Sequence, residues 1–201
     1  MNNFTIKSFA PYSLNYLVYL QNAFIGHAGG VLKFPTFNTT QWGLLEERLF
    51  CDAFRQVWAE MAKRIARNSS ADHNGILTTE QTLFQTLFKP GDQGKQGFAE
   101  SRESFHAWFS SLAGQLTIEL AADHIMYYQM DLYNQLSAAI IHDGKGNREL
   151  LISIIYDECV LGSSDCDSWH AVVSQHDIYI ENKSFVTKIA GQLNRTDDGT
   201  R

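Results

Sequence analysis

The chain has little cysteine and no long apolar run. Its three cysteines are Cys51, Cys159 and Cys166. This odd, sparse set argues against a disulfide scaffold and favours a reducing compartment. No apolar run is long enough to cross a bilayer. The most apolar early segment, 14–24, is interrupted by three amide side chains and lacks a basic start, so it does not resemble a signal sequence. We therefore expect a cytoplasmic protein.

Basic residues are too few and too scattered for a nucleic-acid-binding surface. The formal net charge is −6. The one tight basic group, Lys63, Arg64 and Arg67, falls at the expected C-terminal end of a helix, where cations complement the helix dipole. Phosphate binding is therefore not the leading interpretation of this composition. We expect neither a nucleic-acid nor a membrane partner.

Aromatic residues are plentiful and point to a substantial core. The 201 residues include 13 Phe, 8 Tyr and 4 Trp, and 44% of the side chains are apolar. A chain of this length can bury one large core, and no composition shift marks a linker. The sequence predicts a single domain over 1–193, followed by a disordered polar tail over 194–201.

The N-terminal two thirds of the sequence are helical in pattern. The clearest periodicity predicts one long central helix over 40–67, with Leu49, Val57 and Trp58 buried. Other helices are expected around it, over 13–24, after Thr78, over 98–112 and over 116–135. The segment 89–97 contains a proline and three glycines and no apolar side chain, which predicts a mobile surface loop.

The C-terminal third of the sequence has the composition of strands. Apolar runs over 136–141 and 150–156 flank a turn-rich stretch, 143–147, which predicts a β-hairpin with Ile140, Ile152 and Ile154 in the core. Strands over 169–174 and 178–181 would extend it, a short strand is expected over 4–9, and a closing helix over 185–193. The expected fold class is α+β, with four to five N-terminal helices packed on a small C-terminal antiparallel β-meander.

Catalytic and metal-binding motifs of high specificity are absent. Cys159, Cys166, His170 and His176 are all zinc-ligand types, but only the gap from Cys166 to His170 has the short spacing of a structural zinc site. We therefore expect no bound metal and no cofactor. The glycine-rich stretch 26–30 could cradle an anion with its backbone N–H groups, but a connecting turn fits its surroundings better.

Acidic residues and aromatic rings gather in the predicted C-terminal strands. The residues expected to bind a partner are Asp157, Glu158, Asp165, Asp167, Trp169 and Tyr179. Asp177 and Glu181 lie among them. A carboxylate surface with aromatic rings would attract and hold a basic protein. The alternative is a solvated sheet edge that prevents aggregation.

Two functions from different classes follow from these patterns. The first is a small acidic cytoplasmic protein-binding module of the inhibitor, immunity or regulatory type, with no catalysis of its own. The second is a hydrolase whose site is assembled from the sequence-distant residues His124, Asp157 and His170. A deep pocket where these residues converge would favour the hydrolase. The sequence leaves the partner's identity and the oligomeric state open.

Overall fold

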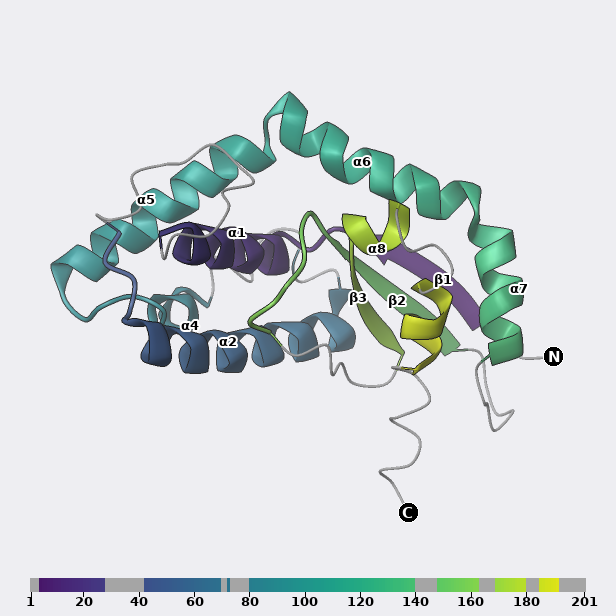
Figure 1. The fold of residues 1–201 in the computed structure, drawn as a ribbon, viewed down its shortest axis with the longest axis horizontal. Helices are drawn as coiled ribbons and strands as arrows, with labels where there is room; N and C mark the ends of the chain where they lie inside the picture. Colours follow the sequence, from purple (N-terminus) through teal and green to yellow (C-terminus); the bar gives the residue numbers. More distant parts are fainter. Residues whose placement is uncertain are drawn as a thin grey trace, which may run out of the picture. The chain divides into compact units, whose positions relative to one another are not determined.

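A computed structural model of the protein describes residues 4–27, 42–69, 72, 80–139, 148–162, 169–179 and 185–191 (Figure 1). In chain order its elements are β1 (Phe4–Phe9), α1 (Tyr12–His27), α2 (Glu47–Arg67), α4 (Gln81–Gln85), α5 (Asp92–Phe109), α6 (Leu112–Tyr127), α7 (Gln129–Ala139), β2 (Arg148–Ile155), β3 (His170–Ser174) and α8 (Gln175–Tyr179). A last helical segment covers 185–191.

The chain divides into two compact units. The sheet unit comprises Met1–Pro11, Leu116–Glu158 and Ser164–Arg201, and the helical unit comprises Tyr12–Gln115 and Cys159–Ser163. The prediction of a single domain over 1–193 stays a prediction. The polar tail, 194–201, lies outside the described residues.

The helical unit is built around the aromatic side of α1. The Tyr16 ring is fully buried, with its centroid 5.8 Å from that of Phe84 and 5.5 Å from that of Phe105. Its hydroxyl lies 2.7 Å from Ser101 Oγ on α5, and Ser101 in turn donates to the carbonyl of Phe98. Burial of a tyrosine hydroxyl is unfavourable without such a partner, so this bond fixes how α1 packs on α5.

The predicted central helix exists but begins later than expected. α2 starts at Glu47, because the backbone before it is extended: Gly43 has a φ of +63° and Leu44 forms an antiparallel bridge with Phe88. The helical periodicity in the sequence continued through this segment, but the bridge to Phe88 overrides it. The prediction of one helix over 40–67 is therefore wrong in its first turns.

The buried face of α2 agrees with the prediction at two of three residues. Val57 and Trp58 are buried, as expected. Leu49 is 60% exposed, so its predicted burial is wrong. Phe50, the next residue, is the one that points inward in the first turn of the helix.

The predicted mobile loop over 89–97 is also wrong. α5 begins at Asp92, within this segment, and both Gly94 and Gly97 are buried. A Cβ atom on Gly97 would lie 1.8 Å from the carbonyl oxygen of Trp42, and one on Gly94 would lie 1.8 Å from that of Lys89. These glycines permit close backbone packing, which the sequence alone does not distinguish from glycines that loosen a loop.

The sheet is parallel, which contradicts the predicted antiparallel meander. Its strand order is β1-β2-β3, so the N-terminal strand pairs with β2 along its whole length. In this register Ile6 lies opposite Leu150, and Leu151 lies opposite His170. β2 is the central strand, and its side chains from Leu150 onward are buried on both faces. A strand of this kind appears in the sequence as a continuous apolar run rather than an alternating one.

The predicted hairpin is wrong for the same reason. Its second strand is β2, but the first apolar run contributes Leu136 to helix α7, where it is buried. Ile140 and the turn 143–147 lie outside the described residues. The strand expected over 178–181 is likewise absent from its described part, since Ile178 and Tyr179 close helix α8. Short apolar runs do not separate a strand from a buried helix.

One face of the sheet is covered by helices of the same unit (Figure 1). α6, α7, α8 and the segment 185–191 supply the cover, and the buried core consists of Phe4, Ala121, Ile125, Leu132, Leu136, Leu150, Ile152, Ile154, Ala171, Val173, Ile178, Phe185, Ile189 and Ala190. The predicted burial of Ile152 and Ile154 is confirmed. The expected strand over 4–9 and the expected helix after residue 185 are present as well.

Candidate functional site

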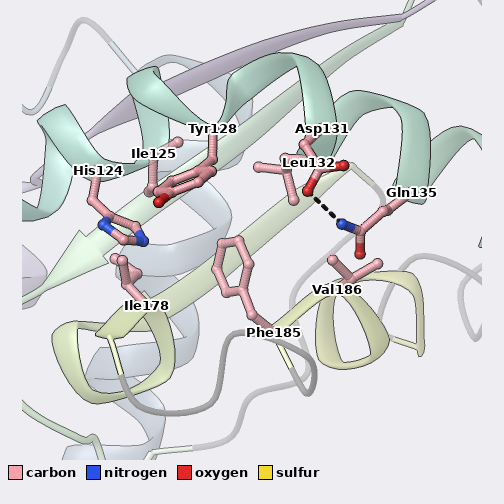
Figure 2. Close-up of a pocket in the computed structure, with 9 residues that line it drawn as sticks. All are labelled: His124, Ile125, Tyr128, Asp131, Leu132, Gln135, Ile178, Phe185 and Val186. Carbon is pink, nitrogen blue, oxygen red and sulfur yellow. Dashed lines mark hydrogen bonds between the residues drawn. The ribbon is translucent and has the colours of Figure 1, made fainter.

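A small cavity lies among the helices that cover the sheet (Figure 2). Its lining residues are His124, Ile125, Tyr128, Asp131, Leu132, Gln135, Ile178, Phe185 and Val186. Its volume is about 30 Å³. Pockets for small-molecule substrates measure about 300–1,000 Å³, so this cavity has room for water or for the tip of one side chain.

His124 is the polar residue of most chemical interest in the cavity. Its ring centroid lies 4.7 Å from that of Tyr128 and 5.2 Å from that of Tyr179. Its Nε2 atom is buried and has no hydrogen-bond partner among the described residues. Burial and the nearby carboxylate of Asp123 raise the pKa of Tyr179, so this phenol stays protonated and neutral. The His124 imidazole therefore places one hydrogen-bonding atom, Nε2, among aromatic rings.

The rest of the cavity is apolar, with one polar pair at its rim. Figure 2 shows the Phe185 ring reaching between the α6 and α7 side chains, opposite Leu132. The carboxylate of Asp131 accepts a hydrogen bond from Gln135 Nε2 at 2.7 Å, one turn along α7. The cavity thus offers packing surface and a single imidazole, rather than a group of titratable side chains that share a proton.

Next to this cavity, α6 and α7 expose an unusual amount of apolar surface. The exposed fractions are 45% for Leu116, 59% for Leu120, 66% for Met126, 81% for Tyr127 and 73% for Met130. Leu116, Leu120 and Tyr127 are spaced by four and seven residues, which places them on one side of the helix. Single exposed apolar residues are ordinary, but several of them gathered on neighbouring turns are typical of a binding surface.

The two carboxylates of α6, Glu119 and Asp123, lie beside this row. Glu119 and Asp123 are exposed on α6, four residues apart, and so lie on the same side of the helix as the apolar row. Between Arg102 and Lys145 the sequence contains no Lys or Arg. We call the five exposed apolar residues, together with Glu119 and Asp123, the α6–α7 surface. Its local field is negative, which favours a positively charged partner.

The structure does not assemble the three residues of the hydrolase hypothesis. His124 lies at the cavity on α6. His170 lies opposite Leu151, in the middle of β2, whereas Asp157 follows the end of that strand. The four residue steps from Leu151 to Ile155 alone span about 13 Å, so His170 and Asp157 lie far apart along the strand.

His170 instead makes a structural contact inside the sheet. Its Nε2 atom lies 2.8 Å from the hydroxyl oxygen of Ser153 on the neighbouring strand. Ser153 is fully buried, and His170 is 1% exposed. A Ser–His pair resembles the nucleophile and base of a hydrolase, but both of these side chains are buried. The contact gives each of them a hydrogen-bond partner.

The predicted acidic-aromatic surface is split between the ends of the sheet. Asp157 and Glu158 follow β2, whereas Trp169 precedes β3 and therefore lies at the other end. Trp169 stacks edge-on against Phe4 and has the guanidinium of Arg148 over its ring at 5.2 Å.

The other acidic and aromatic residues of that region have different surroundings. Tyr179 is 46% exposed at the end of α8 and lies beside His124. Glu158 lies 3.4 Å from His176 Nδ1. Asp177 is buried and paired with Lys188, so it adds no exposed negative charge. Asp165, Asp167 and Glu181 lie outside the described residues.

The four candidate zinc ligands do not form a described cluster. Cys159 belongs to the helical unit, where its sulfur packs against Gly162. Burial raises the pKa of its thiol to about 12 despite hydrogen bonds from the backbone of Gly162 and Leu161, which disfavours the thiolate that zinc requires. Cys166 lies outside the described residues. No group of three or more metal-ligand side chains occurs in the part of the chain that the structure describes.

The glycine-rich stretch 26–30 is described only at its start. Gly26 lies within α1, and 28–30 lie outside the described residues, so the anion-cradle alternative stays a prediction.

Gln21, one turn earlier in α1, has a clear structural role. Its Oε1 atom accepts hydrogen bonds from the backbone N–H groups of Val160 and Leu161, at 2.8 and 3.0 Å, within the helical unit.

Sequence reasoning missed the α6–α7 surface, although a signal for it was present. Helix α6 has apolar residues on both of its sides, since Ile125 is buried while Leu116 and Leu120 are exposed. A helix that is apolar all round is normally buried on all sides. The prediction of a helix over 116–135 explains only its inward side and does not account for the second apolar side.

In comparisons with known families, curated proteins and solved structures, the chain matched none. Among the described residues, no helix combines the length and the apolar composition needed to cross a membrane. Geometry and chemistry are therefore what points to a function.

Proposed function

We propose that the protein is a small acidic binding protein, of the inhibitor, immunity or regulatory type, that holds a basic protein partner in the cytoplasm. The observation that carries this proposal is the α6–α7 surface. It combines a row of exposed leucine, methionine and tyrosine side chains with two carboxylates. Aromatic side chains are enriched among the residues that dominate binding energy at protein interfaces, flexible methionines adapt to a partner's surface, and charges around them steer the approach of the partner.

The geometry of the cavity beside His124 does not suit hydrolysis at that residue. A hydrolase needs room for its substrate, and a cavity of about 30 Å³ is far too small for one. It also needs a base next to an accessible nucleophile, whereas His124 is surrounded by tyrosine rings and apolar side chains, and Ser153 and His170 are both buried. The partner-binding surface of this proposal is not the one the sequence predicted, since Trp169 lies away from Asp157 and Glu158 at the other end of the strands.

A capture experiment with paired variants tests the proposal. The tagged protein, its Leu116→Ser/Leu120→Ser variant and a Leu49→Ser control would be cross-linked in extract from the source cells. Leu49 is the matched control because it is 60% exposed on α2, in the helical unit. We expect one protein to be retained by the wild type and by the control and lost from the double variant. Equal retention by all three would overturn the proposal.

A further inference from the structure

We infer that the segment of the partner that occupies the α6–α7 surface is a basic amphipathic α-helix. This inference rests on the proposed function and specifies the partner's contact segment. On α6 the exposed row runs from Leu116 to Tyr127, 11 residue steps, which at 1.5 Å per residue is about 17 Å of helix, and Met130 follows on α7 after the break at Tyr128. The length on α6 matches a partner helix of about three turns.

The backbone chemistry of α6 favours a helix over an extended segment. Within an α-helix, the backbone N–H and C=O groups of α6 bond to one another, so this surface offers no backbone partners. An extended peptide laid on it would lose water from its own backbone groups without replacing those hydrogen bonds. A helix satisfies its backbone internally and needs only an apolar side, which packs between side chains spaced three, four and seven residues apart.

The charge pattern determines the sign of the partner. Glu119 and Asp123 are four residues apart beside the apolar row. A partner helix with Lys or Arg four residues apart would place its cations opposite both carboxylates. A second copy of this chain would bring the same carboxylates together, and an anionic membrane would repel them. A basic helix is therefore the one occupant that matches both the apolar row and the charges.

The probe is a synthetic peptide of about 15 residues made of Leu and Lys, with all its leucines on one helical side. Two control peptides accompany it: one with Glu in place of Lys, and one with the same composition as the probe in scrambled order. Binding would be measured by titration calorimetry, and helix formation by circular dichroism. We expect the probe to become helical on binding and to bind about tenfold or more tightly than either control.

Two charge variants of the protein identify the surface. Glu119→Lys/Asp123→Lys should weaken binding of the probe by about tenfold or more, because two attractions become repulsions. Glu47→Lys/Asp52→Lys makes the same change in net charge on α2, where both side chains are exposed, and should alter binding by less than about twofold. Equal losses in the two variants would overturn the inference, because the peptide would then sense net charge alone.

Other outcomes also decide against the helix. The inference would be overturned if the scrambled peptide bound as tightly as the probe. It would also be overturned if the protein bound phosphatidylserine vesicles but not the peptide. A dimer in sedimentation that became stronger in Glu119→Lys/Asp123→Lys would overturn it as well. If the peptide fails while the captured protein still discriminates against Leu116→Ser/Leu120→Ser, the inference is wrong and the proposed function stands. If the wild type and Leu116→Ser/Leu120→Ser also retain the same proteins, both the inference and the proposed function are wrong.

Discussion

Asp177 accepts hydrogen bonds from Lys188 Nζ through both carboxylate oxygens, at 2.8 and 2.7 Å, with the carboxylate buried and the lysine partly exposed. The same carboxylate accepts hydrogen bonds from the backbone N–H and the hydroxyl of Ser174. Asp177 thus fixes the start of α8 at the end of β3 and ties α8 to the segment 185–191. Its charge contributes to the fold of the sheet unit and is not available to a partner.

This pair should make stability depend on pH. Burial alone would raise the pKa of Asp177, but hydrogen bonds from Lys188 and Ser174 and the charge of Lys188 outweigh burial and hold the pKa below its ordinary 3.8. A carboxyl whose pKa is lower in the folded state stabilises the fold above its ordinary pKa, and that contribution is lost as pH falls through the folded value. Asp177→Asn should therefore lower the free energy of unfolding by about 2 kcal/mol at neutral pH.

Urea denaturation at neutral pH and over a series of acid pH values measures this effect. The difference between wild type and Asp177→Asn should shrink as pH falls below about 4, where the wild type loses the same interaction. Asp52→Asn is the control, because the pair of Asp52 with Arg55 is exposed and should contribute less than about 1 kcal/mol. A constant difference across the acid range would show that the carboxylate charge is not what stabilises this contact.

The parts of the fold that the sequence predicted are those with a strong local pattern. α2 has a periodic apolar stripe, so its existence and the burial of Val57 and Trp58 followed from spacing alone. The parallel sheet did not follow, because β1 and β2 are separated by more than a hundred residues and no local signal records their pairing. Leu136 illustrates the difficulty, since an apolar residue before a turn-rich segment fits a strand and a helix equally well.

Close packing at Gly97 should make this glycine irreplaceable. In Gly97→Ala the new methyl group would lie 1.8 Å from the carbonyl oxygen of Trp42, so the backbone of α5 or of the segment around Trp42 would have to move. We expect a loss of about 1–3 kcal/mol or more in the free energy of unfolding. Gly191→Ala is the matched control, because a Cβ there meets nothing within 4 Å.

Chemical denaturation of the two glycine variants, followed by tryptophan fluorescence, checks this prediction. Gly191→Ala should leave stability unchanged or raise it slightly, since alanine is the better helix former. A Gly97→Ala variant as stable as the wild type would mean that α5 does not pack against the backbone of Trp42.

The thiol of Cys159 should be unreactive in the folded protein. Burial raises its pKa to about 12, and only the thiolate reacts with iodoacetamide. At neutral to mildly alkaline pH, mass spectrometry should therefore find Cys159 alkylated slowly in the native state and rapidly in urea. Zinc bound at this thiol would require the same deprotonation, so we also expect elemental analysis of the purified protein to find no stoichiometric metal. Metal that is lost in a Cys159→Ser variant would contradict both expectations.

The candidate site was less accessible to sequence reasoning than the fold. His124 was named as a possible catalytic residue, and the structure places it at a cavity, but the residues around it come from α7, α8 and 185–191 as well as α6. Their approach depends on how these helices pack on the sheet, which no spacing in the sequence encodes. The acidic residues around Glu119 are visible in the sequence. They indicate a binding surface only once Leu116 and Leu120 are known to be exposed.

The two sides of α6 should respond differently to the same substitution. Ile125 is 3% exposed and belongs to the core of the sheet unit, so Ile125→Ala should lower the free energy of unfolding by about 2–5 kcal/mol. Leu120 is 59% exposed, and Leu120→Ala should change it by less than about 0.5 kcal/mol. Both substitutions introduce alanine into the same helix, so helix propensity contributes little to the difference in unfolding free energy between the two variants. Urea titration of each variant measures the difference, and a large loss in Leu120→Ala would mean that this side chain supports the fold and is not free to bind a partner.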